Sequence, residues 1–295
     1  MAERMYYGGQ AVVEGVMMRG QKTMVTAVRR PDGGLAIDTQ PLAPIYTGWL
    51  RRTPLLRGVI VLIESMVLAI KTLLYSANVS LENEDEKVSG GLVWVMLVVA
   101  LAFAVALFFL VPLLLTRRLD ISSPILFSLI DGLIRVAIFI LYLWLMAFLP
   151  DIKRTFAYHG AEHKTINAYE AGIPLELESV KRYSTAHVRC STSFLFVVLL
   201  ISIFVFALTG IRVPWLMFLS RIVLIPVSAG LSYEVIYFGG RHADNRLVRV
   251  LLAPGLWLQS LTTREPDDGQ LEVALAALKR VVEVEEGEQA ESPAP

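Results

Sequence analysis

The chain has 295 residues, of which 55% are hydrophobic and only 18% are charged, and its mean hydropathy is +0.57. Soluble domains usually carry about a quarter charged residues, so this composition predicts membrane-spanning segments rather than one large soluble core. The formal net charge is zero, and no basic stripe with interleaved aromatic residues occurs, so no nucleic-acid partner is expected. Cys190 is the single cysteine, which excludes an intramolecular disulfide and suits a reducing compartment.

Residues 1–54 predict a small β-rich module. Residues 23–30 and 35–42 flank the sequence Pro-Asp-Gly-Gly, whose glycines can adopt positive φ, and a β-hairpin is expected there. The preceding segment, residues 8–20, contains four glycines. Its backbone is therefore expected to bend or to approach another group closely.

Residues 55–78 predict an amphipathic helix. Arg57, Glu64 and Lys71 recur every seven residues and so lie on one stripe of an otherwise apolar cylinder. We expect this helix to lie in the membrane interface or along the spanning bundle. A helix that crossed the bilayer would bring Glu64 near its middle, at a high cost in free energy.

Four apolar segments are long enough to span a bilayer, whose core requires about 20 helical residues. They are residues 92–116, 124–150, 190–211 and 215–238. The second segment contains Asp131 and Arg135, which lie four residues apart on one helix face and can neutralise each other. The fourth segment contains Arg221 and Glu234. The fold class expected is an α-helical integral membrane protein with about four transmembrane helices.

Lysine and arginine counts near the ends of the spans predict the orientation. Six such residues lie in the polar loop 151–189 and four follow the last span, against three on the opposite side. We therefore expect a multi-pass protein of the bacterial cytoplasmic membrane, with the loop and both termini in the cytoplasm.

The segment 239–284 is expected to be cytoplasmic and to contain an amphipathic helix. Asp267 and Gln270 can form a capping box at its start. The helix would carry one apolar stripe, formed by Leu271, Leu275, Leu278 and Val282. Residues 285–295 are acidic and then proline-rich, a composition typical of a disordered tail.

The central loop contains the string H-x-x-E-H, formed by His159, Glu162 and His163. On a helix the two histidines lie on one face and could bind a single divalent metal, with zinc expected. Glu162 lies beside the second histidine, where it could accept a proton from water that the metal activates. The pattern is that of the inverted zincins, although a string with three fixed positions also arises by chance.

A catalytic zinc has three protein ligands and one open position. His187 is the best candidate for the third ligand because it lies on the same polar side of the membrane, and Cys190, three residues further on, could serve instead. Glu170 and Glu234 are further candidates. Cys190 could instead be a nucleophile of low pKa next to an arginine, or an ordinary residue at the start of the third span.

Four longer motifs resemble the YqhQ-like family, an uncharacterised group of bacterial membrane proteins. They are GGQAVVEGVMMRG, YHGAEHKTINAYE, HVRCSTSF and PGLWLQSLTTREPDDGQLEVAL. The resemblance covers about residues 5–280 and implies a multi-spanning membrane protein, in a family that has carried the label of predicted metal-dependent enzyme. The positions that match its motifs are His159, Glu162, His163, His187 and Cys190. One departure is Val188, where the family pattern leads us to expect proline.

These patterns support two hypotheses of different classes. The first is a metal-dependent protein, with hydrolysis as the candidate activity, that acts at the cytoplasmic membrane surface on lipid or on a membrane-proximal peptide. The metal ligands would be His159 and His163 with His187 or Cys190, and Glu162 would be the general base. The second hypothesis is a non-enzymatic membrane scaffold or regulator. An exposed apolar patch on the 271–282 helix would favour it, and so would histidines already satisfied by backbone groups. A homo-oligomer or a protein partner is compatible with both.

Overall fold

The computed structural model describes residues 7–81, 90–211, 213–242 and 245–291. The strands are β1 (Gly8–Val12), β2 (Gly15–Arg19), β3 (Thr23–Arg29) and β4 (Leu35–Pro41). The first helices are α1 (Leu56–Val79), α2 (Gly90–Val105), α3 (Val111–Arg117) and α4 (Pro124–Met146), with a π-helical turn at Ala106–Leu110 that joins α2 to α3. The later helices are α5 (Pro150–Glu170), α6 (Leu177–Val180), α7 (Ser191–Ala207), α8 (Pro214–Arg241), α9 (Arg246–Thr262) and α10 (Asp268–Glu291).

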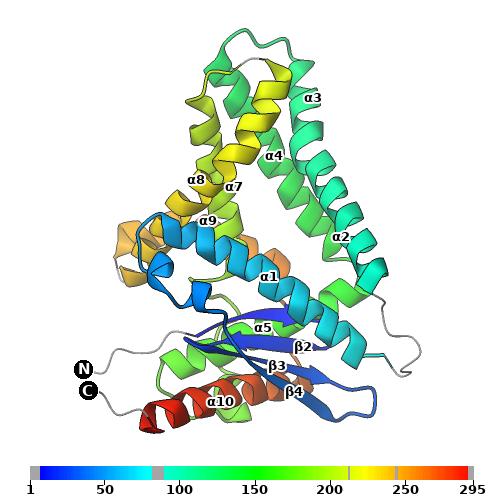
Figure 1. Cartoon of the computed structure of the whole chain (residues 1–295), viewed down its shortest axis with the longest axis vertical. Helices are drawn as coiled ribbons and strands as arrows, with labels where there is room; N and C mark the ends of the chain where they lie inside the picture. Colours follow the sequence, from blue (N-terminus) through cyan, green and yellow to red (C-terminus); the bar gives the residue numbers. More distant parts are fainter. Residues whose placement is uncertain (1–6, 82–89, 212, 243–244, 292–295) are drawn as a thin grey trace.

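These elements form two tiers (Figure 1). The upper tier is a bundle in which α2 and α3 form one arm and α4, α7 and α8 form the rest. The lower tier contains the sheet with α5 and α10, and α1 lies crosswise between the two tiers. The first and last described elements, β1 and α10, both belong to the lower tier.

Four of the described helices are long and apolar enough to cross a membrane: α1, the continuous helix over 91–117, α4 and α8. Of the four segments expected to span, 92–116, 124–150 and 215–238 correspond to three of these. The expected span 190–211 corresponds to α7, which is apolar but only 17 residues long. The helix expected to lie at the interface, α1, passes the same length and composition criteria, yet it lies across the bundle rather than within it (Figure 1).

The N-terminal strands form an antiparallel sheet in the order β1-β2-β3-β4. The expected hairpin is confirmed as β3 and β4, and Gly33 in its turn has a φ of +84°. Strands β1 and β2 were not expected, because the glycines of residues 8–20 obscure the alternation typical of a strand. Gly15 lies so close to the carbonyl of Ala27 on β3 that a side chain there would overlap with it.

The sheet is not an isolated module, since both of its faces are buried. Val16 and Met18 face α5 and α10. Met17, which lies between them in sequence, packs instead with Leu68 of α1. Because successive side chains of β2 point to opposite faces of the sheet, this strand packs against the lower tier with one face and against α1 with the other.

Helix α10 packs against β2, β3 and α5. Its capping box is confirmed, because the Asp267 and Gln270 side chains each accept a hydrogen bond from the other residue's backbone N–H, at 2.8 and 2.9 Å. The apolar stripe expected on this helix is covered, with Leu271 and Leu278 fully buried in the lower core. The stripe therefore offers no exposed patch of the kind that the scaffold hypothesis required.

Two expectations about the polar segments are refined by the structure. In the segment 151–189, the helix expected around H-x-x-E-H is present as α5 and extends over 21 residues, from Pro150 to Glu170. Residues 285–291, expected to be disordered, continue α10. The reason is that the buried carboxylate of Glu285 accepts a hydrogen bond from the backbone N–H of Lys22 at 2.9 Å, so the helix end is tied to the β2–β3 turn. Residues 292–295 lie outside the described chain.

The charged residues inside the bundle form a triad. Asp131 and Arg135 on α4 form the expected pair, with 2.8 Å between the carboxylate and the guanidinium. Arg221 of α8 contacts the same carboxylate oxygen at 2.9 Å. One carboxylate therefore holds two arginines, and all three side chains are buried.

Candidate functional site

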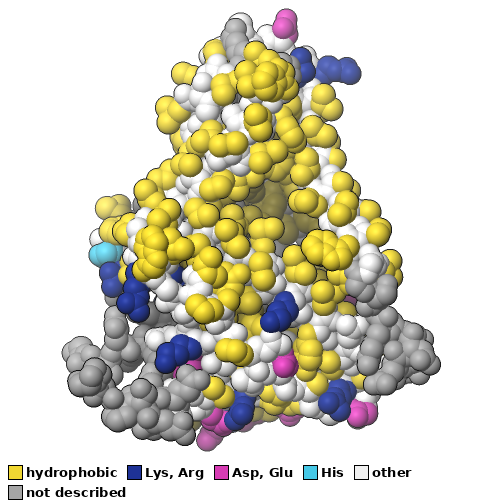
Figure 2. Space-filling view, in the orientation of Figure 1, with side chains coloured by type: hydrophobic (Ala, Val, Ile, Leu, Met, Phe, Trp, Pro, Cys, Tyr) yellow, Lys and Arg dark blue, Asp and Glu magenta, His cyan; other side chains and the backbone are white. Residues whose placement is uncertain are grey.

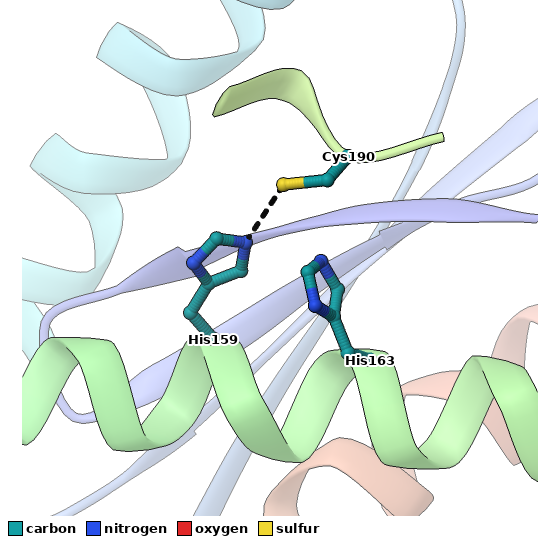
Figure 3. A group of neighbouring side chains, drawn as sticks. All are labelled: His159, His163 and Cys190. Atoms are coloured by element: carbon teal, nitrogen blue, oxygen red, sulfur yellow. Dashed lines mark hydrogen bonds between the residues drawn. The ribbon is translucent and has the colours of Figure 1, made fainter. Parts of the chain in front are cut away.

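His159 and His163 lie four residues apart on α5 and point away from it in the same direction (Figure 3). Their rings are 4.4 Å apart, centroid to centroid. The helical segment expected for H-x-x-E-H is thus present, and both imidazoles leave the helix on the face that the i,i+4 spacing predicts.

Backbone carbonyls orient both rings. Nδ1 of His159 lies 2.8 Å from the carbonyl oxygen of Thr262, and Nδ1 of His163 lies 2.6 Å from that of Thr185. A carbonyl oxygen only accepts a hydrogen bond, so each Nδ1 carries the proton and donates it. Each Nε2 then keeps its lone pair, the tautomer in which an outer hydrogen bond prepares a histidine for metal binding.

Cys190 completes this group. It is the N-cap residue of α7, and its thiol lies 3.3 Å from Nε2 of His159 (Figure 3). The ligand atoms of His159, His163 and Cys190 all lie within 4.8 Å of one another. His163 and Cys190 are buried, and the His159 side chain is 12% exposed. Zinc bond lengths to nitrogen and sulfur put the donors of one tetrahedral site about 3.3–3.6 Å apart, so the histidine–cysteine pair already has a suitable spacing.

Glu162 lies between the two histidines. Its Oε2 atom is 3.8 Å from Nε2 of His159 and 3.8 Å from Nε2 of His163. Burial raises the pKa of this carboxyl above its ordinary value, while His159 and His187 act in the opposite direction. A Cβ atom on Gly9 would lie only 2.7 Å from Cγ of Glu162. Strand β1 therefore approaches the carboxyl closely, as the glycine-rich segment suggested.

The other candidate ligands have different neighbours. His187 lies beside His163, with 5.7 Å between ring centroids, but its Nε2 atom faces Glu170 at 3.5 Å. Glu170 also pairs with Arg189. Glu234 lies with Arg57 and accepts a hydrogen bond from the backbone N–H of Leu55. The geometry therefore brings Cys190 to His159 and His163. The other candidates, His187, Glu170 and Glu234, lie outside this group of three residues.

The group opens into a cavity of about 400 Å³ between the two tiers. Helix α5 contributes His159, Glu162 and His163 to its wall, and the sheet contributes residues of β1 and β2. The remaining wall comes from α1 and from the ends of α7 and α8 that face the lower tier. An open volume beside three convergent donors is what a catalytic metal site requires.

Sequence reasoning missed the residues that hold the histidines in place. Thr185 and Thr262 act through backbone carbonyls, for which no side-chain pattern exists. Gln259 was also missed: its buried amide accepts the backbone N–H of His187 and donates to the carbonyl of the same residue, at 2.9 and 2.8 Å. Gly160, which lies inside the histidine motif, was a feature of the sequence that could have indicated a close contact on this face of α5.

Gly160 allows the segment after α9 to lie directly on α5. A Cβ atom there would overlap with the carbonyl oxygen of Arg264, whose backbone N–H donates to the carbonyl of Phe156 at 2.9 Å. We expect Gly160→Ala to lower stability by about 1–2 kcal/mol, since overpacking costs more than the gain of about 1 kcal/mol in helix propensity. The displaced Thr262 would also release His159.

The measurement is the thermal unfolding midpoint of the detergent-purified protein. Gly91→Ala is the matched control, because Gly91 is also helical and a Cβ atom there meets nothing within 4 Å. An unchanged midpoint in Gly160→Ala would contradict this role.

Comparison with known proteins gives two matches. Residues 53–284 match the family described as "Protein of unknown function (DUF1385)". The chain is also 37% identical over 301 residues to "Uncharacterized protein YqhQ" of Bacillus subtilis (strain 168), an alignment that covers 95% of this chain and 93% of that protein.

This chain belongs to the DUF1385 family.

The resemblance to YqhQ-like proteins is thereby confirmed. The DUF1385 match includes α5, α7 and α8, and hence His159, His163 and Cys190, whereas the sheet lies before its first residue. The similarity to YqhQ extends over nearly the whole chain. No solved structure matches the chain.

Proposed function

We propose that this DUF1385 protein is a metal-dependent hydrolase of the bacterial cytoplasmic membrane, with its site at the cytoplasmic surface of the bilayer. His159, His163 and Cys190 would hold a divalent metal ion, with zinc the expected ion, and Glu162 would serve as general base. The substrate would be a lipid or a membrane-proximal peptide.

One observation carries the proposal. The ligand atoms of two imidazoles and one thiol lie within 4.8 Å of one another beside the cavity. The hydrogen bonds at Nδ1 leave the Nε2 lone pair of each imidazole available to a metal ion. Two nitrogens and one sulfur form a donor set that suits zinc, and three protein ligands leave one position open. Histidines with a purely structural role would use both ring nitrogens in hydrogen bonds within the protein. Within the described part of the chain, the Nε2 atom of His159 has only the thiol of Cys190 at hydrogen-bonding distance.

The chain's own residues would then divide the work. A bound divalent ion supplies Lewis acidity and makes water acidic enough to lose a proton near neutral pH. Glu162, 3.8 Å from both Nε2 atoms, would accept that proton and deliver it to the leaving group. Thr262 and Thr185 would keep the imidazoles oriented, and the buried walls would limit access of bulk water.

The surroundings of the site support a position at the membrane surface. Apolar side chains cover the upper tier, whereas charged side chains gather on the lower tier and at the opposite tip (Figure 2). The excess of lysine and arginine in residues 151–189 and after α8 supports a cytoplasmic location of the lower tier. The presence of both β1 and α10 in this tier agrees with cytoplasmic termini.

The test is the metal content of detergent-purified full-length protein, measured by elemental analysis after loading with zinc. We expect near-stoichiometric zinc in the wild type and its loss in His159→Ala, His163→Ala and Cys190→Ser. His187→Ala should retain most of it. His242→Ala is the matched control, because His242 is an exposed histidine outside the cavity. Absence of bound metal from the wild type after loading would refute the proposal.

The thiol–imidazole contact favours a second candidate, a cysteine hydrolase without metal. Cys190 is the N-cap residue of α7, its thiol accepts a hydrogen bond from the backbone N–H of Thr192 at 3.4 Å, and Nε2 of His159 lies 3.3 Å away as a base. The two candidates differ in one result. The cysteine hydrolase would keep its activity in the presence of a chelator and lose it on alkylation of Cys190, whereas the metal enzyme would be inactivated by the chelator.

A further inference from the structure

The cavity beside the proposed metal centre has one apolar side and one cationic side. Val61 of α1, Phe194 of α7 and Ile236 of α8 line the apolar side. Its charged lining residues are Arg19, Arg51, Arg189 and Arg241 against Glu64 and Glu162. Arg189 is already paired with Glu170, so three arginines and two glutamates remain in the lining.

Two of these arginines meet at Glu64 of α1. Its side chain is 4% exposed, and its two carboxylate oxygens are taken by different arginines. Arg19 of β2 lies 2.8 Å from Oε1, and Arg51 binds Oε2. Both arginines retain partial exposure, at 17% and 24%. Glu285 of α10 is a further acidic neighbour of Arg19, whereas Arg51 has Glu64 as its carboxylate partner.

Arg241 adds a further cation at the end of α8. Its guanidinium lies 4.8 Å from the ring centroid of Tyr237, and both residues line the cavity. Arginine presents N–H donors in a planar fork that matches the oxygens of a phosphate. The cationic side of the cavity is therefore built from groups that favour a phosphate-bearing ligand.

The helices around the cavity turn apolar side chains outward. On α1 the buried residues include Glu64, Thr72 and Ser76, whereas Met66 is 56% exposed. Helix α9, which lies at a similar level (Figure 1), exposes Leu247, Val250 and Trp257. A helix that buries polar residues and exposes apolar ones is suited to contact with lipid. The cavity therefore lies beside helix faces that are suited to contact with lipid.

We propose that the cavity binds a phospholipid, with its phosphate at Arg19, Arg51 and Arg241 and the start of an acyl chain against Val61, Phe194 and Ile236. The assignment of phospholipid as the substrate class rests on the hydrolase function proposed above. The assignment of the cavity as a phospholipid-binding site does not depend on that function. A peptide substrate would gain little from three arginines beside an apolar wall, whereas a phospholipid matches both sides of the cavity.

The test is calorimetric titration of the metal-free, detergent-solubilised full chain with dihexanoyl-phosphatidic acid. Arg51→Gln is the informative variant, because Glu64 keeps Arg19 as its partner and no buried carboxylate loses its counter-charge. We expect this variant to bind the lipid at least tenfold more weakly. Arg52→Gln is the matched control, since Arg52 is the exposed neighbour outside the cavity and should bind like the wild type.

Two further ligands show separately how much the phosphate group and the acyl chains contribute to the affinity. Inorganic phosphate should bind more weakly than the short-chain lipid by a factor of ten or more, because it lacks the apolar part. Dihexanoyl-glycerol, which lacks the phosphate, should also bind more weakly and should not distinguish Arg51→Gln from the wild type. Equal affinity of Arg51→Gln and the wild type for phosphatidic acid would overturn the proposal, and so would equal affinity for phosphatidic acid and dihexanoyl-glycerol.

These outcomes are separable from the fate of the proposed hydrolase. Zinc binding without phosphatidic acid binding would leave the metal enzyme standing and assign it another substrate, such as a membrane-proximal peptide. Phosphatidic acid binding without zinc binding would remove the metal enzyme and leave a lipid-binding cavity.

Discussion

Replacement of Glu162 by glutamine is expected to reduce hydrolysis by a factor of about 10²–10⁴, the usual contribution of a general base, with zinc content unchanged. The reason is positional: the Glu162 carboxyl lies 3.8 Å from Nε2 of each histidine but outside the group of three convergent donors. Glutamine has nearly the same shape and can still donate or accept hydrogen bonds. It cannot accept the proton.

The measurement is the rate at which phosphatidylglycerol in mixed micelles is converted to products, followed by mass spectrometry, alongside the zinc content of the same preparations. Glu178→Gln is the matched control, because Glu178 is an exposed carboxylate that pairs with Lys181 at the surface. A variant at Glu162 that hydrolyses lipid as fast as the wild type would exclude the general-base role. Loss of zinc in this variant would instead identify Glu162 as a ligand.

The second large effect is expected inside the bundle, where Asp131→Asn should destabilise the protein by about 3–5 kcal/mol, the cost of leaving buried charges without their partner. The Asp131 carboxylate contacts Arg135 at 2.8 Å and Arg221 at 2.9 Å, and the side chains of both arginines are 3% exposed. An asparagine would leave two buried guanidinium groups facing each other with no counter-charge.

Arg221→Gln provides the matched comparison for this prediction. It removes one of the two cations and leaves the i,i+4 pair of Asp131 and Arg135 balanced. We therefore expect a clearly smaller loss of stability, measured as the midpoint of unfolding in a detergent titration. Equal losses in the two variants would show that charge balance does not govern this cluster.

Local patterns in the sequence were informative wherever the structure is itself local. Hydropathy located the apolar helices, since length and composition suffice for that. Turn chemistry located the β3–β4 hairpin, and the Asp267–Gln270 capping box located the start of α10. The i,i+4 spacing of His159 and His163 placed both on one helix face, and the same rule paired Asp131 with Arg135.

The failures concern contacts between elements that are distant in the chain. Strands β1 and β2 were not predicted because their glycines obscure the alternation of a strand, whereas β2 is stabilised by burial on both faces. The end of α10 was expected to be disordered because its sequence is acidic. Glu285 lies 263 positions from Lys22 in the chain, and no local pattern indicates that the two residues meet.

By itself the sequence determined that this is a helical protein with membrane-compatible segments, and that a histidine pair with a neighbouring glutamate lies on one helix. Only the tertiary structure decided which further residue joins that pair. The sequence favoured His187 over Cys190, yet the N-cap position of α7 brings Cys190 to His159, whereas His187 faces Glu170. The physical reason is that helix periodicity fixes directions around one axis, whereas the position of one element relative to another depends on packing across the whole interface.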